Sequence, residues 1–233
     1  YSVYGGEVNF AYETLGIISF TNELWTSDRM SPDARYGQSQ KDRLWADDHL
    51  TMGAGFVDWH PFEHPVYGAI EIGGFRKDVG RVPPSYLIEE MLHRNALFCI
   101  RHAEAMPQVQ IQSTEVTDLP GGLYALDVTF KNLREIPTRT ALAAQKGIGM
   151  PDRLELTTER GSTEVIAAGF LRDKYRPNRL DLVENNPASI PLESGLTSRG
   201  ELTLRWILSG QGTVQVSWSG EKAKDVTQEV EVK

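Results

Sequence analysis

The second half of the chain consists of short runs that alternate apolar and polar residues, and this pattern limits the fold more than any other feature. The runs follow Pro107 and are separated by turn signals such as Pro120-Gly121-Gly122. Alternation predicts strands that bury one face, and short strands at this spacing are typical of a sandwich. We therefore expect an all-β, immunoglobulin-like sandwich over residues 107–233. The expected strands are residues 109–111, 124–130, 154–157, 165–170, 179–183, 201–208, 213–218 and 226–232.

The first half contains the clearest helix of the chain. From residue 86 to about residue 105, apolar residues recur every three or four positions, after Pro83-Pro84 and before Pro107. Prolines suit the first turn of a helix and the position just beyond its end. Cys99 belongs to the apolar stripe, so we expect it to be a small buried side chain.

Two strands are also expected before residue 107, at residues 15–21 and 65–74, where apolar runs are bounded by turn residues. Residues 26–64 are polar, show no strong period and are predicted to form a long loop of the kind that serves as a lid or binds ligands. These elements predict two strands and a helix within residues 1–106.

Composition excludes several classes of function. The chain has 24 Lys and Arg against 32 Asp and Glu, a net charge of −8, and no basic run, so we expect no nucleic-acid partner. No apolar run approaches the ~18 residues of a membrane span. The single cysteine excludes an intrachain disulfide. The chain begins at Tyr1 without a Met or a leader-like segment, from which we expect a processed product or part of a longer protein.

Glu23 is the first candidate for catalysis, because it closes the expected strand at residues 15–21. A carboxylate at the end of a buried strand projects into a cleft, where desolvation can raise its pKa towards the range of a general base. A glutamate in this position is more often simply solvated, so the position alone does not identify a site.

The surrounding residues add a specific pattern. Tyr1 precedes Glu23 by 22 positions, Gly5 follows Tyr1 by four, and residues 19–24 read Ser-Phe-Thr-Asn-Glu-Leu. This pattern resembles the segment of the zinc carboxypeptidase family that carries its mobile tyrosine and its catalytic glutamate. Residues 64–74 also resemble a stretch of large bacterial members of the family, so the resemblance extends to about residue 105.

The resemblance implies a role for each matched residue. Glu23 would be the general base and Tyr1 would close over the substrate, while Thr21 would lie in the substrate-binding segment. Val8 falls where the family sets side-chain preference, and an apolar residue there suggests an uncharged terminal side chain on a peptide or protein substrate.

The resemblance also implies that the zinc ligands and the arginines that hold the substrate carboxylate precede the tyrosine. They would belong to a missing N-terminal half of an α/β/α catalytic domain. Because the family's reaction needs zinc to activate water, we expect this chain alone to bind no metal and to hydrolyse no peptide.

A second motif competes with this interpretation. His60-Pro61-Phe62-Glu63-His64 has the spacing of an inverted zinc motif, which works on a continuous helix. Pro61 and Pro65 disfavour a helix there, so we expect polar residues of the long loop. An independent metalloenzyme that uses His60, Glu63 and His64 stays an alternative. We also expect Asp47 and Asp48 to lie in a solvated acidic loop.

Taken together, the sequence predicts the C-terminal portion of a secreted or periplasmic zinc carboxypeptidase that hydrolyses C-terminal peptide bonds. Residues 1–106 would be the catalytic part and residues 107–233 the appended sandwich. Without its other half, the catalytic part is expected to expose apolar surface and to self-associate. The alternative is a non-catalytic module that binds a peptide or a glycan. Trp206 and Trp218 would then be an aromatic platform, although strand tryptophans are ordinarily part of a core.

Overall fold

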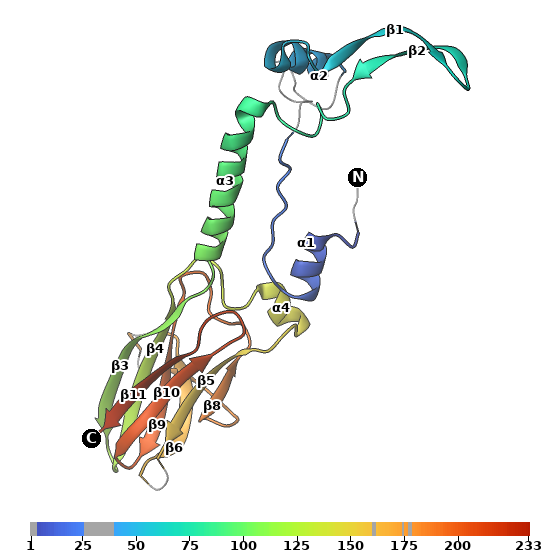
Figure 1. The fold of residues 1–233 in the computed structure, drawn as a ribbon. Helices are drawn as coiled ribbons and strands as arrows, with labels where there is room; N and C mark the ends of the chain where they lie inside the picture. The colour runs from blue at the N-terminus through green and yellow to red at the C-terminus, as the bar shows by residue number, and fades with distance from the viewer. Residues whose placement is uncertain (1–3, 26–39, 160–161, 174, 177–178) are drawn as a thin grey trace. The chain divides into compact units, whose positions relative to one another are not determined.

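The computed structural model describes residues 4–25, 40–159, 162–173, 175–176 and 179–233 (Figure 1). These residues form two compact units. The first contains the residues up to Phe20 together with Arg101–Lys233, and the second is Thr21–Ile100. The division of the chain at residues 106 and 107 stays a prediction.

The first unit contains two antiparallel sheets, which we call the two-sheet region (Figure 1). The five-stranded sheet has the order β3-β4-β9-β6-β7 and the four-stranded sheet the order β11-β10-β5-β8. The strands are β3 (Val109–Leu119), β4 (Leu123–Asn132), β5 (Asp152–Thr158), β6 (Glu164–Leu171), β7 (Leu180–Leu182), β8 (Ser189–Leu192), β9 (Glu201–Ser209), β10 (Gly212–Ser219) and β11 (Val226–Val232).

One hydrophobic core lies between the two sheets. Leu126 and Phe130 of β4 and Trp206 of β9 enter it from one sheet, and Val216 and Trp218 of β10 enter it from the other. All five side chains are fully buried. The predicted β-rich second half is therefore confirmed, and both tryptophans are core residues, so they form no exposed platform.

Two elements of this region were not expected. Strand β8 has only four residues, one of them Pro191, so it is too short to show alternation. Helix α4 (Ala141–Lys146) is also short. The Thr140 side chain accepts a hydrogen bond from the Ala143 backbone at its start, and Gly147 ends it in a left-handed conformation with φ 65°.

The first unit also contains helix α1 (Glu7–Asn9) and the π-helix η1 (Phe10–Thr14). The strand predicted at residues 15–21 is wrong, because this segment is irregular in the structure. Gly16 has φ 63°, which interrupts an extended path, and the Ile17 amide donates to the Ala11 carbonyl instead of to a neighbouring strand. A strand needs a pairing edge, and the described residues give this segment none.

The second unit contains helix α2 (Gln40–Ala46), π-helix η2 (Asp47–Thr51) and a hairpin of β1 (Phe56–His64) and β2 (Gly68–Phe75). The predicted strand at residues 65–74 is confirmed as β2. The long loop predicted to end at His64 is wrong from Gln40 onward, because helices and β1 occupy most of that stretch.

Helix α3 (Ser85–Glu104) confirms the helix predicted from the apolar period. It begins in the second unit and ends in the first. Burial of its stripe is not observed, because no residue of α3 is fully buried and Cys99 is exposed. No helix in the described ranges combines the length and the apolar character needed to cross a bilayer.

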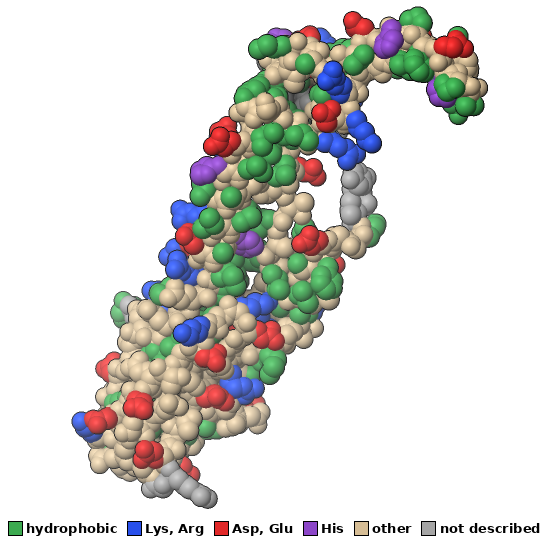
Figure 2. Space-filling model, in the orientation of Figure 1, with side chains coloured by type: hydrophobic (Ala, Val, Ile, Leu, Met, Phe, Trp, Pro, Cys, Tyr) green, Lys and Arg blue, Asp and Glu red, His purple; other side chains and the backbone are tan. Residues whose placement is uncertain are grey.

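Apolar side chains are distributed unequally along the chain. Before Val109, the buried apolar side chains among the described residues are only Ala46, Pro83 and Pro107. Exposed large apolar side chains are instead concentrated before residue 107, for example Tyr4 (91% exposed), Phe20 and Tyr86. Figure 2 shows such side chains along α3 and over α1 and η1. The described part of residues 1–106 therefore has almost no core of its own.

Candidate functional site

The segment that carries Glu23 is irregular and open to solvent. Thr21 and Glu23 are both exposed. Between them, the Asn22 side chain donates a hydrogen bond to the Asn95 side chain of α3, with a nitrogen–oxygen distance of 3.0 Å. Tyr1 lies outside the described residues. The structure therefore shows the Glu23 carboxylate accessible to water and its neighbour tethered to α3.

Val8, predicted to set side-chain preference, lines a shallow pocket of about 290 Å³. The other lining residues are Asn9, Tyr12, Glu13, Ile18 and Ser19. Ser19 donates its hydroxyl hydrogen to the Val8 carbonyl at 3.4 Å, so the segment that leads to Glu23 folds back over α1. The pocket therefore combines the apolar surface of Val8 and Ile18 with polar groups, among them the carboxylate of Glu13.

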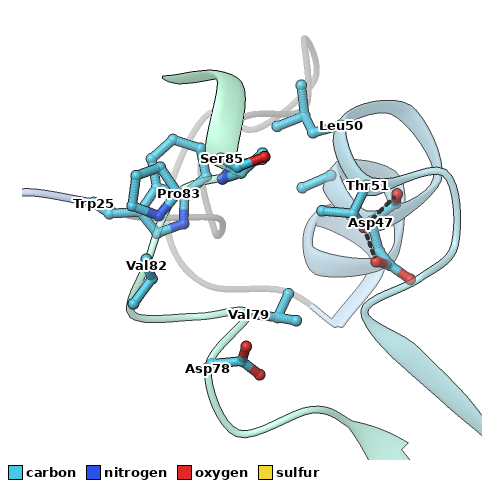
Figure 3. A pocket seen from close by; sticks show the side chains of 11 residues that line it. Trp25, Asp47, Leu50, Thr51, Asp78, Val79, Val82, Pro83 and Ser85 are labelled. Atoms are coloured by element: carbon cyan, nitrogen blue, oxygen red, sulfur yellow. Dashed lines mark hydrogen bonds between the residues drawn. The ribbon is translucent and has the colours of Figure 1, made fainter. Parts of the chain in front are cut away.

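A more enclosed cavity, of about 220 Å³, lies where α3 begins (Figure 3). Its walls are mostly apolar and come from the end of the Glu23 segment, from α2 and η2, and from the turn before α3. The lining residues are Trp25, Ala46, Asp47, Leu50, Thr51, Asp78, Val79, Val82, Pro83, Pro84 and Ser85.

Two polar groups of this cavity could interact with a ligand. Asp47 is only 2% exposed, and its Oδ1 accepts hydrogen bonds from the Gly55 amide, at 2.7 Å, and from the Thr51 hydroxyl (Figure 3). Trp25 Nε1 is buried, and no hydrogen-bond partner for it exists among the described residues. The cavity could hold a small apolar group beside an indole donor, two residues along the chain from Glu23.

The burial of Asp47 corrects the prediction of a solvated acidic loop. A Cβ added at Gly55 would collide with Asp47 Oδ1 and with Val79, so only glycine lets the two segments approach this closely. The sequence signal was an acidic residue followed eight positions later by a glycine, which is too common to indicate burial.

The motif at residues 60–64 lies in strand β1, where it pairs with β2 from His60 opposite Ile72 to His64 opposite Gly68. Successive side chains of a strand point to opposite faces, so Glu63 lies on the face opposite to both histidines. His64 Nδ1 instead accepts hydrogen bonds from the amides of Val66 and Tyr67, at 3.1 and 3.2 Å. The strand therefore places Glu63 away from the two histidines, whereas this zinc motif needs all three side chains on one side.

A polar groove of about 670 Å³ crosses the outer face of the five-stranded sheet. At its floor Arg205 of β9 makes two hydrogen bonds, each 2.6 Å long, to the two carboxylate oxygens of Asp127 of β4. The hydrogen bonds with Asp127 raise the pKa of Arg205. Beside this pair Thr129 and Thr203 share a hydrogen bond of 2.8 Å across the same strands.

Further side chains extend this groove over the neighbouring strands β3 and β6. They include Ser113, Glu115 and Thr117 of β3 and the adjoining Arg172. Hydroxyls, carboxylates and guanidinium groups thus gather on one face, where they could bind a ligand rich in hydrogen-bonding groups.

Comparison with known protein families gives a match to a domain of unknown function, DUF8731, over residues 108–231. This stretch is more than half of the chain. The chain belongs to the DUF8731 family. A search of curated proteins with the sequence found no match.

The DUF8731 domain spans the two sheets from β3 to β11 and contains the polar groove. Val8, Thr21 and Glu23 precede the matched residues. Sequence reasoning missed both the groove and the cavity at α3. Alternation along their strands places Asp127 and Arg205 on the face away from the core, but no sequence signal indicated that these strands are neighbours.

Proposed function

We propose that the chain is the C-terminal portion of a zinc-dependent carboxypeptidase that removes residues from the C-terminus of a peptide or protein. Glu23 would accept a proton from the attacking water, Tyr1 and Thr21 would contact the substrate, and the Val8 pocket would receive an uncharged terminal side chain. The proposal includes a carboxypeptidase-like α/β/α domain, an immunoglobulin-like sandwich and a secreted or periplasmic location.

The observation that carries the proposal is the absence of a core from the described part of residues 1–106. Domains bury the apolar faces of their elements against another layer, and large exposed apolar patches mark missing partners. Along α3, Leu92 and Leu97 are about half exposed, at 53% and 47%, and Ile100 is 54% exposed. This surface is what the last part of an α/β/α domain would present to the layers that complete it.

The proposal locates the zinc ligands in that completing part. In the described ranges, no three His, Cys, Asp or Glu side chains lie close enough together to hold a metal ion. The described residues therefore do not fit a zinc ion by themselves. What this chain would contribute is the carboxylate of Glu23 and the walls of the substrate pocket.

The experiment uses the complete protein that contains this chain and compares Glu23→Gln with the control Glu89→Gln, an exposed glutamate of α3. Release of the C-terminal amino acid from a peptide that ends in an apolar residue is followed over time. Loss of a general base should lower kcat by about 10²–10⁴-fold with little change in KM, while the control keeps full activity. A Glu23→Gln enzyme with kcat within a few-fold of the unmodified protein contradicts the proposal.

The polar groove of the DUF8731 domain favours a second candidate function, a non-catalytic module that binds a peptide or a glycan. Its fixed Asp127–Arg205 pair and the hydroxyls around it are features of a surface that recognises polar ligands. In this case a specific ligand remains bound after Glu23→Gln and is lost after Arg205→Met. Binding lost in neither variant would exclude the groove as the binding surface.

A further inference from the structure

The Gly16 carbonyl is held by two groups from distant parts of the two-sheet region. The Thr140 hydroxyl donates to it at 3.1 Å, and the Lys222 ammonium donates to it at 2.8 Å. These donors lie 124 and 206 residues further along the chain. One buried acceptor thus joins the N-terminal segment, the start of α4 and the β10–β11 connection.

The fit around Gly16 is close enough to require glycine. Gly16 has φ 63°, a conformation that residues with a Cβ rarely adopt, and an added Cβ would lie 2.7 Å from the Ala143 Cβ. Ala143 is only 1% exposed and belongs to the short helix α4. Both the conformation and the contact therefore select against any side chain at this position.

Buried polar groups around α4 fix the residues that contact Gly16. Arg139, 5% exposed, donates through Nη1 to the Glu193 carbonyl and carboxylate and through Nη2 to the Ile148 carbonyl, which fixes α4 and the residues after it. Thr140 accepts a hydrogen bond from the Ala143 amide while it donates to Gly16, so its hydroxyl uses both roles at once. The Lys222 side chain is partly buried, and this burial lowers the pKa of its ammonium group.

A second contact lies further along the same segment. The Phe20 ring meets the His102 ring edge-on, with centroids 5.0 Å apart. Both residues belong to the first unit, so the segment is attached to that unit at Gly16 and again at Phe20. Glu23 follows Gly16 by seven residues and Phe20 by three.

From these contacts we propose that Gly16, Thr140 and Lys222 form a docking seat through which the DUF8731 domain holds residues 15–20, the segment that leads to Glu23. Thr140 and Lys222 are positioning residues, because they act on the backbone before Glu23 and touch no substrate. The docking itself is independent of any activity, whereas its catalytic consequence rests on the proposed carboxypeptidase function. The domain would thus be a required part of the catalytic unit.

The experiment separates docking from catalysis in the complete protein. Lys222→Met and Gly16→Ala are compared with the matched controls Lys224→Met, which alters an exposed lysine, and Gly121→Ala, a glycine with φ 84° and open space around its Cα. Amide hydrogen exchange of residues 15–20 reports docking, and kcat and KM for peptide hydrolysis report positioning.

We expect exchange of residues 15–20 to accelerate about tenfold or more in both seat variants, with strands of the two-sheet region still protected and both controls unchanged. We expect kcat to fall about tenfold or more with KM retained, since a misplaced base affects the transition state and leaves binding intact. Thr140→Ser, which keeps the hydroxyl, should retain docking, and Thr140→Val should lose it.

Unchanged exchange in both seat variants would overturn the docking seat. Accelerated exchange with unchanged kcat in an active enzyme would overturn the positioning role. If Glu23→Gln shows that the protein is not a peptidase, the exchange result still decides whether the seat exists. Loss of protection throughout β3 to β11 in the seat variants would show a structural role only and would also overturn the proposal.

Discussion

Two tryptophans of the same core differ in hydrogen bonding, and this difference predicts unequal costs for the same substitution. Trp206 and Trp218 are both fully buried in the core between the two sheets. Trp206 Nε1 donates to the Pro187 carbonyl at 2.8 Å, whereas the buried Trp218 Nε1 has no partner among the described residues. Replacement by phenylalanine removes one donor from each site and a similar volume of side chain.

The magnitude follows from the two hydrogen-bonding states. Trp206→Phe leaves the Pro187 carbonyl without this donor, which costs about 1–3 kcal/mol in addition to the cost of the cavity. Trp218→Phe also incurs the cost of a cavity. It leaves no acceptor without a donor, however, and it removes the penalty of a buried donor that has no partner, which offsets part of the cavity cost. We expect Trp206→Phe to be less stable than Trp218→Phe by about 1–3 kcal/mol.

Urea unfolding followed by far-UV circular dichroism measures the difference, because this signal does not depend on the replaced fluorophores. The slope of the free energy of unfolding against urea should be the same for both variants, so that midpoints can be compared directly. Equal stabilities, or a less stable Trp218→Phe variant, would refute the reasoning from hydrogen bonding.

Three further predictions concern charge and surface. Burial raises the pKa of Asp152 above its usual 3.8, so its favourable contribution is complete below pH 3.8 and is lost as the pH rises through the folded-state pKa. As the pH rises from 3.8 through the folded-state pKa, the free energy of unfolding of the unmodified protein should therefore fall relative to that of Asp152→Asn. The fall should be about 1.4 kcal/mol for each unit by which the folded-state pKa exceeds 3.8, and a rise would contradict this. Arg205→Lys, which keeps the charge but loses the two-pronged contact with Asp127, should cost about 1 kcal/mol in urea unfolding, whereas an unchanged midpoint would show that the pair is solvated. A protein of residues 1–233 should self-associate in sedimentation experiments and bind an apolar dye, whereas residues 107–233 alone should fold as a monomer. A monomeric 1–233 protein that binds no dye would count against the incomplete-domain proposal.

Local patterns predicted much of the fold correctly. In β4, burial of Leu126, Val128 and Phe130 and outward placement of Asp127 and Thr129 follow directly from alternation. Helix α3 begins and ends within a residue or so of its predicted bounds. Both signals depend only on neighbouring residues, which is why they can be read without knowledge of the rest of the chain.

Predictions failed where an element depends on a distant partner. Residues 15–21 have the composition of a strand, but a strand forms only against an edge, and Gly16 is instead bonded to Thr140 and Lys222. Cys99 belongs to an apolar stripe but is exposed, since burial requires a second surface. For the candidate site, sequence resemblance alone selected Glu23 and Val8, and the structure placed only Val8 in a pocket.

By itself, the sequence determined the β-rich character of the second half, the long helix before it and the inward and outward faces of alternating strands such as β4. Its resemblance to a known family selected the residues to test for catalysis. The tertiary structure alone decided that β4 lies beside β9, which brings Asp127 to Arg205, and that Gly16 is bonded to residues far along the chain. The physical reason is the range of the interactions. Periodicity reflects contacts between near neighbours, whereas strand order and buried polar contacts arise only when distant segments compete for the same core and the same hydrogen-bonding groups.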